Sequence, residues 1–153
     1  MTLNNTSRGL LNENNQILFI EYHINGEIIY SLPGGKVEVG ESLKECVIRE
    51  FAEETEIIIE AKELILLNEF INPKPNSVSK RWENGIHQIE SIFRVERVNN
   101  SNKNIMKKLD IGMQKAKWLN AEELEVVQYY PEMPIKWFFK RNSQPINIYK
   151  IKK

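Results

Sequence analysis

GKVEVGESLKECVIREFAEETEI, residues 35–57, is the stretch of this sequence that decides the fold. Ser42 and Glu45 have the S-x-x-E spacing of a capping box, which predicts a helix that begins directly after Ser42. Apolar or small residues then recur at i, i+3, i+4 and i+7, the spacing of one helix face. This predicted core-facing stripe consists of Ile48, Phe51, Ala52 and Thr55. We therefore expect a long helix that packs on the body of the protein along this stripe.

The same helix carries three glutamates on another face. At about 100° per residue, Glu50, Glu53 and Glu54 share an arc of about 100° that points away from the stripe. Like charges at this spacing repel one another, and among near neighbours only Arg49, four residues before Glu53, offers compensation. A divalent cation is the simplest further partner. Carboxylate oxygens without a nearby cysteine cluster favour Mg²⁺ or Mn²⁺, which typically bridge protein carboxylates to substrate phosphates.

Pro33-Gly34-Gly35 lies directly before this helix region. The triplet predicts a loop whose backbone, free of side chains at the two glycines, can approach a metal or a phosphoryl oxygen closely. The loop and the carboxylate helix are therefore expected to form one site.

The rest of the chain reads as strands and short helices. Strands are expected at residues 9–11, 16–22, 27–32, 64–71, 86–98 and 115–119, with hairpin turns near Asn14 and Gly26. Residues 72–85 form a predicted long loop, residues 121–127 a short helix capped by Asn120, and the segment after Pro134 another helix. Residues 145–153 are an edge strand or a frayed end. This order predicts a mixed sheet with helices on its faces.

Length and composition predict a single domain over residues 1–153, with one cysteine and hence no intramolecular disulfide. Lys plus Arg and Asp plus Glu each total 21, so the formal net charge is zero. The charges are unevenly placed: residues 38–63 hold nine acids and three bases, a net of −6, whereas residues 136–153 hold six bases and no acid. With no membrane-spanning or leader pattern, we expect a cytoplasmic monomer or homodimer that does not bind a membrane or polymeric nucleic acid.

From Gly35 the chain gives G-x5-E-x7-R-E-F-x-E-E-x-E-I, with Glu41, Arg49 and Glu50 at the first charged positions. This resembles the Nudix box, G-x5-E-x7-R-E-U-x-E-E-x-G-U with U apolar. The resemblance implies an α/β (α+β) fold, the Nudix α/β/α sandwich with a mixed sheet. It also implies hydrolysis of a nucleoside diphosphate linked to another moiety, with Mg²⁺ or Mn²⁺ as cofactor and a small nucleotide as substrate.

Carried over position by position, the resemblance implies a role for each matching residue. Glu50, Glu53 and Glu54 would bind the metal, with the Gly35 carbonyl as a further ligand. Arg49 would orient these carboxylates, and Glu41, with Gly34, would support the loop and the start of the helix. Of the three carboxylates we favour Glu53 as the general base.

Two positions need separate treatment. Glu56 stands where the family has glycine, and an αL helix end costs a residue with a Cβ about 1 kcal/mol relative to glycine. Glu90, in the strand predicted at residues 86–98, lies in a region that in relatives can add a carboxylate to the metal site; the alternative is that strand alternation sends it to solvent.

Several other residues are candidates for a functional or a structural role. Trp82, with Lys80 and Arg81 beside it, is suited to stacking on a base while the cations meet phosphates, or to plain packing. His23, His87 and Cys46 are expected to be structural. Substrate markers leave nucleoside triphosphates, nucleotide sugars, ADP-ribose and dinucleotides open. The rival hypotheses are a Nudix-like module that binds a nucleotide without turnover and a structural domain whose acidic helix is merely solvated.

Overall fold

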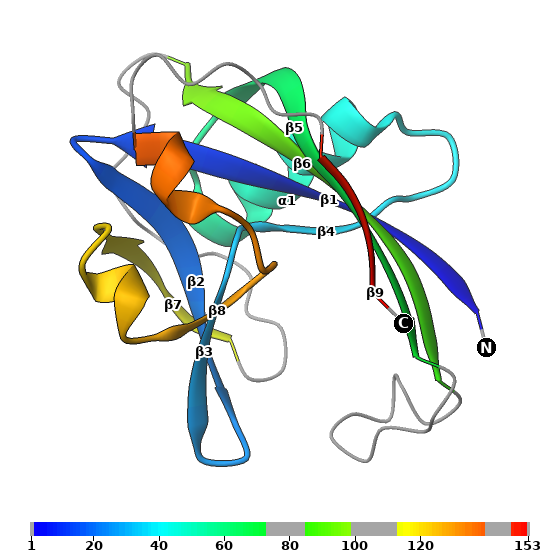
Figure 1. Cartoon of the computed structure of the whole chain (residues 1–153). Coiled ribbons are helices and arrows are strands. Elements are labelled where there is room, and N and C mark those ends of the chain that lie inside the picture. The colour runs from blue at the N-terminus through cyan, green and yellow to red at the C-terminus, as the bar shows by residue number, and fades with distance from the viewer. Residues whose placement is uncertain (1, 73–84, 99–112, 140–147, 153) are drawn as a thin grey trace.

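The computed structural model describes residues 2–72, 85–98, 113–139 and 148–152. A nine-stranded mixed sheet forms the frame (Figure 1). Its strands are β1 (Leu3–Glu13), β2 (Gln16–Ile24), β3 (Glu27–Ser31), β4 (Gly34–Lys36), β5 (Ile59–Asn72), β6 (Ile86–Arg97), β7 (Met113–Leu119), β8 (Gln128–Tyr130) and β9 (Ile148–Lys152). The remaining elements are the helix α1 (Leu43–Thr55) and two 3₁₀ helices, η2 (Glu123–Glu125) and η3 (Ile135–Phe139).

The sheet runs in the order β8-β3-β2-β1-β6-β5-β9, with β4 paired to β1 and β7 paired to β2. Strands β1 and β2 form a hairpin around Asn14 and Asn15, both of which have positive φ, as a primed turn requires. The long central pairing of β1 with β6 is parallel, whereas β5 pairs with β6 in the antiparallel sense. The predicted mixed sheet is therefore confirmed.

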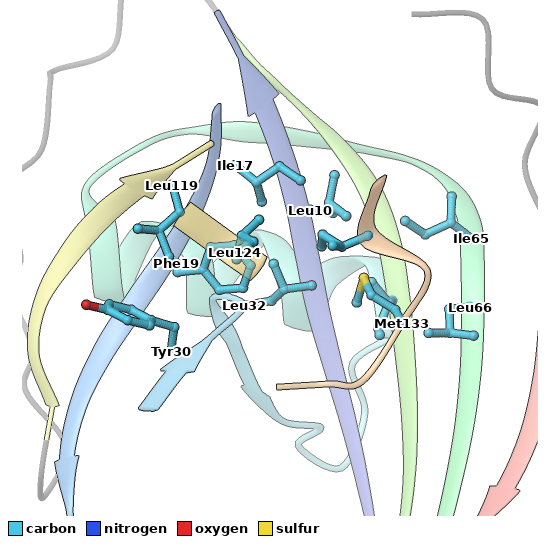
Figure 2. Close-up of a cluster of buried hydrophobic side chains, with 12 residues drawn as sticks. Leu10, Ile17, Phe19, Tyr30, Leu32, Ile65, Leu66, Leu119, Leu124 and Met133 are labelled. Atoms are coloured by element: carbon cyan, nitrogen blue, oxygen red, sulfur yellow. The ribbon is translucent and has the colours of Figure 1, made fainter. Parts of the chain in front are cut away.

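Neighbouring residues of β1 point to opposite faces of the sheet, and each face has its own hydrophobic core. Leu11 belongs to a cluster with Val47 and Phe51 of α1. Leu10 belongs to the other cluster, together with Leu124 of η2 and Met133 (Figure 2). Ile135 of η3 is part of the same cluster. The layers are thus α1, the sheet and the 3₁₀ segments, which confirms the predicted sandwich in its order of layers.

Three local predictions were wrong. Gly34–Lys36 is a short strand rather than a loop, because its backbone pairs with Thr6–Arg8 of β1. The segment after Asn120 makes only one 3₁₀ turn: Asn120 Oδ1 accepts a hydrogen bond from Glu123 N at 2.9 Å, but the chain is too short there to sustain an α-helix. The last helix is likewise 3₁₀.

Within the described ranges, no helix is long and apolar enough to cross a bilayer.

Candidate active site

The capping box fixes where α1 starts. Ser42 Oγ accepts a hydrogen bond from Glu45 N at 3.2 Å, and Glu45 Oε2 accepts one from Ser42 N at 2.7 Å. One turn earlier, Glu41 Oε1 accepts a hydrogen bond from Glu38 N at 2.8 Å. Each carboxylate therefore satisfies a backbone N–H that has no partner within the helix. The path of the chain from β4 into α1 is set by these contacts.

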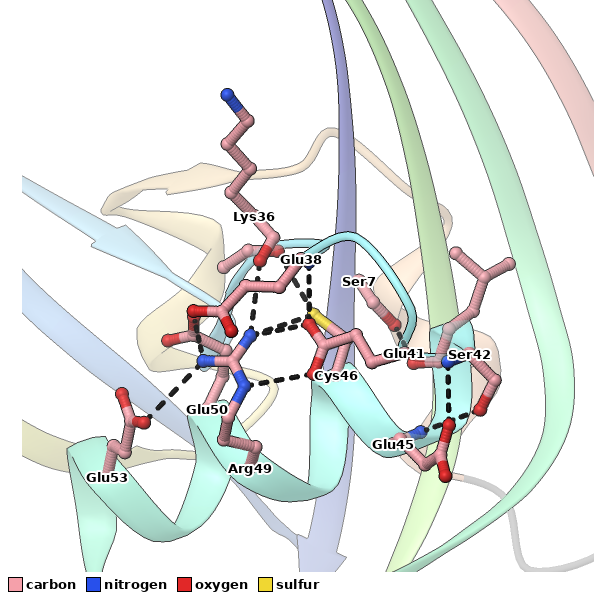
Figure 3. A network of polar contacts seen from close by, with 12 residues as sticks. Ser7, Lys36, Glu38, Glu41, Ser42, Glu45, Cys46, Arg49, Glu50 and Glu53 are labelled. Carbon is pink, nitrogen blue, oxygen red and sulfur yellow. Dashed lines mark hydrogen bonds and ion pairs between the residues drawn. The ribbon is translucent and has the colours of Figure 1, made fainter.

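Arg49 is the centre of the polar network on α1 (Figure 3). Its Nη2 and Nε donate to the two oxygens of Glu41 at 2.6 and 3.0 Å, and its Nη1 donates to Glu50 Oε1 at 2.8 Å. Glu53 lies 3.6 Å from Nη1, and the Lys36 carbonyl accepts from Nη2 at 3.2 Å. The guanidinium thus connects α1 to Lys36 and Glu41, which precede the helix, and offsets the repulsion among the glutamates.

These contacts shift the pKa of both partners. The hydrogen bonds from Arg49 lower the pKa of Glu41 to about 2, and the same contact, followed by that with Glu50, raises the pKa of Arg49 above its usual range. Both groups therefore stay charged across the physiological range.

Gly35 is held against Glu50. A Cβ on Gly35 would lie 2.4 Å from Glu50 Cδ and 2.5 Å from Glu50 Oε1, so the carboxylate occupies the place of a side chain. The Gly35 carbonyl accepts a hydrogen bond from Cys46 Sγ at 3.6 Å. Cys46 is fully buried, and this burial, followed by the charge of Glu41, raises the pKa of its thiol to about 12. The cysteine is therefore a neutral packing residue of the site.

Glu50, Glu53 and Glu54 of α1 do not all face solvent. The side chain of Glu53 is 32% exposed and that of Glu50 is 18% exposed, but Glu54 is buried, with 5% exposure. Glu54 Oε1 accepts a hydrogen bond from Gly34 N at 3.3 Å. The prediction that all three glutamates point away from the core was wrong for Glu54, because β4 packs along this side of the helix. The buried face accordingly includes Cys46 and Val47, while Ile48 and Ala52 are only partly buried.

Glu90 lies on the opposite face of the sheet from α1. It sits opposite Thr6 in the β1–β6 pairing, and its side chain, 1% exposed, forms an ion pair with Arg8 Nε. The alternative that strand alternation sends Glu90 to solvent is thus wrong. Arg8 also donates from Nη1 to the Leu32 carbonyl at 2.9 Å, and its guanidinium lies 5.8 Å from the centre of the Tyr130 ring.

The sequence reasoning missed Arg8 and Tyr130. Arg8 lies in the polar run Asn4-Asn5-Thr6-Ser7-Arg8, which carries no strand periodicity. Its two partners, Glu90 and Tyr130, each lie more than 80 residues away in the sequence. Trp82, Arg81 and Lys80, named above as substrate-binding candidates, lie outside the described residues.

The donor set of the site suits a hard cation. Glu50, Glu53 and Glu54 supply carboxylate oxygens, and β4 supplies side-chain-free backbone beside two of them. As the side chains lie, no three His, Cys, Asp or Glu residues in the described ranges surround a common metal position. Arg49 instead supplies positive charge to Glu41, Glu50 and Glu53.

The mixed sheet, α1 and the glutamates around Arg49 define a class of protein, and comparisons with known proteins assign the chain to a family of that class. A family model described as the NUDIX domain matches residues 6–138, and the chain belongs to this family. Its Nudix box therefore carries Glu56 in place of the family glycine, at the αL end of α1 with φ 57°.

The chain is also similar to individual proteins. It is 41% identical over 58 residues to an ADP-ribose pyrophosphatase from Methanocaldococcus jannaschii, a match that covers 37% of this chain and 34% of that protein. Among solved structures, it superposes on a NUDIX hydrolase from Nitrosomonas europaea with TM-score 0.67 and 21% identity, over 88% and 85% of the two chains. It superposes on a MutT protein from Methanosarcina mazei with TM-score 0.62 and 24% identity, over 91% of each.

Proposed function

We propose that this protein hydrolyses a phosphoanhydride bond in a nucleoside diphosphate linked to another group, with Mg²⁺ or Mn²⁺ as cofactor. The observation that carries the proposal is the packing of the Glu50 carboxylate in the side-chain position of Gly35, beside Glu53 and Glu54. A solvated acidic helix would have no reason to place a carboxylate against a glycine backbone. The name of the Methanocaldococcus relative, a pyrophosphatase, supports the same bond type.

Glu50, Glu53, Glu54 and the Gly35 carbonyl would hold the metal. When bound, the cation would supply positive charge for the phosphoryl oxygens and for activation of the attacking water. Arg49 has a positioning role: it already holds Glu50 and Glu53 on one side of the helix, and Glu41 fixes the guanidinium in turn.

We assign Glu53 as the general base that accepts the proton of the attacking water. Glu53 is the most exposed of the three carboxylates, and it lies farther from Arg49, at 3.6 Å, than Glu50 does, at 2.8 Å. In the reaction, the water oxygen forms a bond to phosphorus, the bridging P–O bond breaks, and Glu53 accepts the proton that the water releases.

A panel of nucleoside triphosphates, nucleotide sugars, ADP-ribose and dinucleotides, assayed with Mg²⁺, tests the proposal. We expect turnover of at least one of them, a loss of about 100-fold or more in kcat for Glu53→Gln, and none for the exposed control Glu27→Gln. Tight binding of one compound without turnover of any would overturn the hydrolase in favour of a binding module.

Mn²⁺ titration of the same variants tests the cofactor separately. Wild type and Glu27→Gln should bind the ion and Glu53→Gln should bind it more weakly. Equal and negligible affinity in all three proteins would leave the acidic helix as a merely solvated surface.

A further inference from the structure

The Arg8–Glu90 pair leaves one buried acceptor unused. Glu90 Oε1 is held by Arg8 Nε, but Glu90 Oε2, buried with it, accepts no hydrogen bond from the residues that the structure describes. Burial, followed by the charge of nearby Glu90, raises the pKa of Tyr130, but Oε2 itself has no hydrogen-bond partner among the described residues. Leaving a buried acceptor unpaired costs free energy, so Oε2 is available to a donor that arrives with a ligand.

The surroundings of Glu90 Oε2 select the kind of donor. Another metal ion is disfavoured because the Arg8 guanidinium is already bound to the same carboxylate and would repel it. A phosphate is disfavoured because the carboxylate itself is negative. A neutral N–H group fits, since it offers a proton to the free oxygen and brings no net charge.

The aromatic ring of Tyr130 lies beside Glu90. Tyr130 is 37% exposed, and its ring packs under the Arg8 guanidinium. A flat group with an N–H donor at its edge could stack on an exposed ring of this kind and reach the carboxylate with the edge. A sugar hydroxyl would satisfy the oxygen but would make no use of the ring.

Strand β4 connects this cluster to the candidate active site. A Cβ on Gly34 would lie 2.6 Å from Arg8 Cα, and Gly34 N donates to Glu54. One residue thus contacts both the strand residue that holds Glu90 and the innermost carboxylate of α1. In the arrangement inferred below, a nucleotide with its phosphates at the α1 carboxylates would extend past Gly34 toward the Arg8 side of β4.

We propose that Glu90 Oε2 accepts a hydrogen bond from an amino group of the substrate nucleobase, which stacks on Tyr130, so that the protein prefers an amino-bearing base. This inference rests on the proposed function, because it assigns the nucleoside end of the same substrate. Glu90 is here a specificity-determining residue, and Arg8 is a positioning residue that keeps Oε1 turned away from the base.

The ion pair makes the effect of Glu90→Gln directional. Arg8 has only donors, so it keeps the amide oxygen of the glutamine on its own side. The amide NH₂ is then aimed where Oε2 was, and an acceptor for the base becomes a donor. The variant should lose the preference for amino groups rather than lose affinity for all bases equally.

Calorimetric binding of nucleoside monophosphates, without metal, tests this independently of turnover. The pairs AMP and purine riboside monophosphate, GMP and IMP, and CMP and pyrimidin-2-one riboside monophosphate each differ by one amino group, replaced by hydrogen, so that no ring nitrogen gains a proton. Wild type should prefer the amino partner in at least one pair by about tenfold, and Glu90→Gln should abolish or invert that preference. Glu96→Gln, a control at an exposed carboxylate on the same strand, should retain it.

Tyr130→Leu provides a second variant that leaves the Arg8–Glu90 pair in place. It should weaken binding of every base and keep the amino preference. Equal affinities within all three pairs for wild type, or a preference that survives in folded Glu90→Gln, would overturn the inference. Absence of turnover together with the expected binding pattern would overturn the hydrolase proposal alone.

Discussion

Arg49 shows what a single position in a motif does and does not reveal. Its sequence neighbour at i+4, Glu53, is the partner that helix spacing predicts, yet the closest contacts are with Glu41, eight residues earlier. The spacing of the motif could predict which residues gather, since they share one helix or its entrance. It could not predict that β4 would bury Glu54 or that Arg49 would reach the Lys36 carbonyl, because both depend on strand pairing with β1.

The Glu41–Arg49 contact predicts a specific loss of stability in acid. The pKa of Glu41 is about 2 in the folded chain against an ordinary value of 4.5. Because the folded state favours the charged form, the contribution is complete above pH 4.5 and disappears as the pH falls toward 2. Thermal unfolding followed from neutral pH to about pH 2 should show Glu41→Gln less stable than wild type near neutrality and converging with it in acid.

The exposed residue Glu27 supplies the control for this measurement. Glu27→Gln should track the wild-type curve throughout. A constant gap between wild type and Glu41→Gln over the acid range would contradict the assigned titration.

Adjacent glycines in β4 should respond differently to alanine. At Gly34, with φ 151°, a Cβ would lie 2.2 Å from the Ser7 carbonyl oxygen, so Gly34→Ala should cost about 2 kcal/mol or more of unfolding free energy. At Gly35 the Cβ meets only the flexible end of Glu50, so Gly35→Ala should cost less than about 1 kcal/mol. Its turnover should still fall by about 10- to 100-fold, because the displaced carboxylate is a proposed ligand.

Chemical denaturation and hydrolysis rates of the two variants separate these effects. Full activity in Gly35→Ala would mean that Glu50 does not need its place against the backbone. A wild-type midpoint for Gly34→Ala would contradict the close approach of β4 to β1.

At the scale of elements, both ends of α1 could be predicted because their signals are local. The capping box lies within four residues, and the αL end at Glu56 follows from the position of a glycine in the family motif. Strands β4 and β8 could not be predicted, because each has three residues and exists only through pairing with β1 or β3. Short elements of this kind have no periodicity of their own.

Glu56 predicts a stabilising substitution. Its φ of 57° is strained for a residue with a Cβ, and its charge lies at the negative end of the helix dipole. Glu56→Gly should therefore raise the unfolding free energy by about 1 kcal/mol. The matched control is Glu56→Ala, which removes the same side-chain charge and contacts but keeps the Cβ.

Denaturant unfolding of the two variants isolates the backbone effect. Glu56→Gly should be more stable than Glu56→Ala by about 1 kcal/mol. Equal stability of the two variants would show that φ at this position carries no strain in solution.

At the scale of the whole molecule, the sheet separates the carboxylates of α1 from the Arg8–Glu90 pair, and Gly34 of β4 contacts both groups. The acids of α1 and the buried core with Phe51 lie on one face, whereas Arg8, Glu90 and the core with Phe19 lie on the other. The zero net charge of the chain could not reveal this arrangement, and neither could the acidic run of residues 38–63. Placing Arg8 against Glu90 requires the parallel register of β1 and β6, which no local signal encodes.

Because each face of the sheet has its own core, we expect core substitutions on the two faces to cost similar stability but to affect Mn²⁺ binding at α1 differently. Phe51 and Phe19 are both fully buried, and replacing either with leucine should cost about 1 to 3 kcal/mol. Phe51 lies on α1, packed against β1 at Gly9, where a Cβ would be 3.0 Å from its ring. Phe51→Leu should therefore let α1 shift and weaken Mn²⁺ binding well below the unfolding temperature. Phe19→Leu, on the other face, should lose similar stability with Mn²⁺ affinity unchanged. Calorimetric titration of both variants alongside their denaturation curves measures the difference, and parallel losses of metal affinity would show that the carboxylates depend on global stability rather than on the seating of α1.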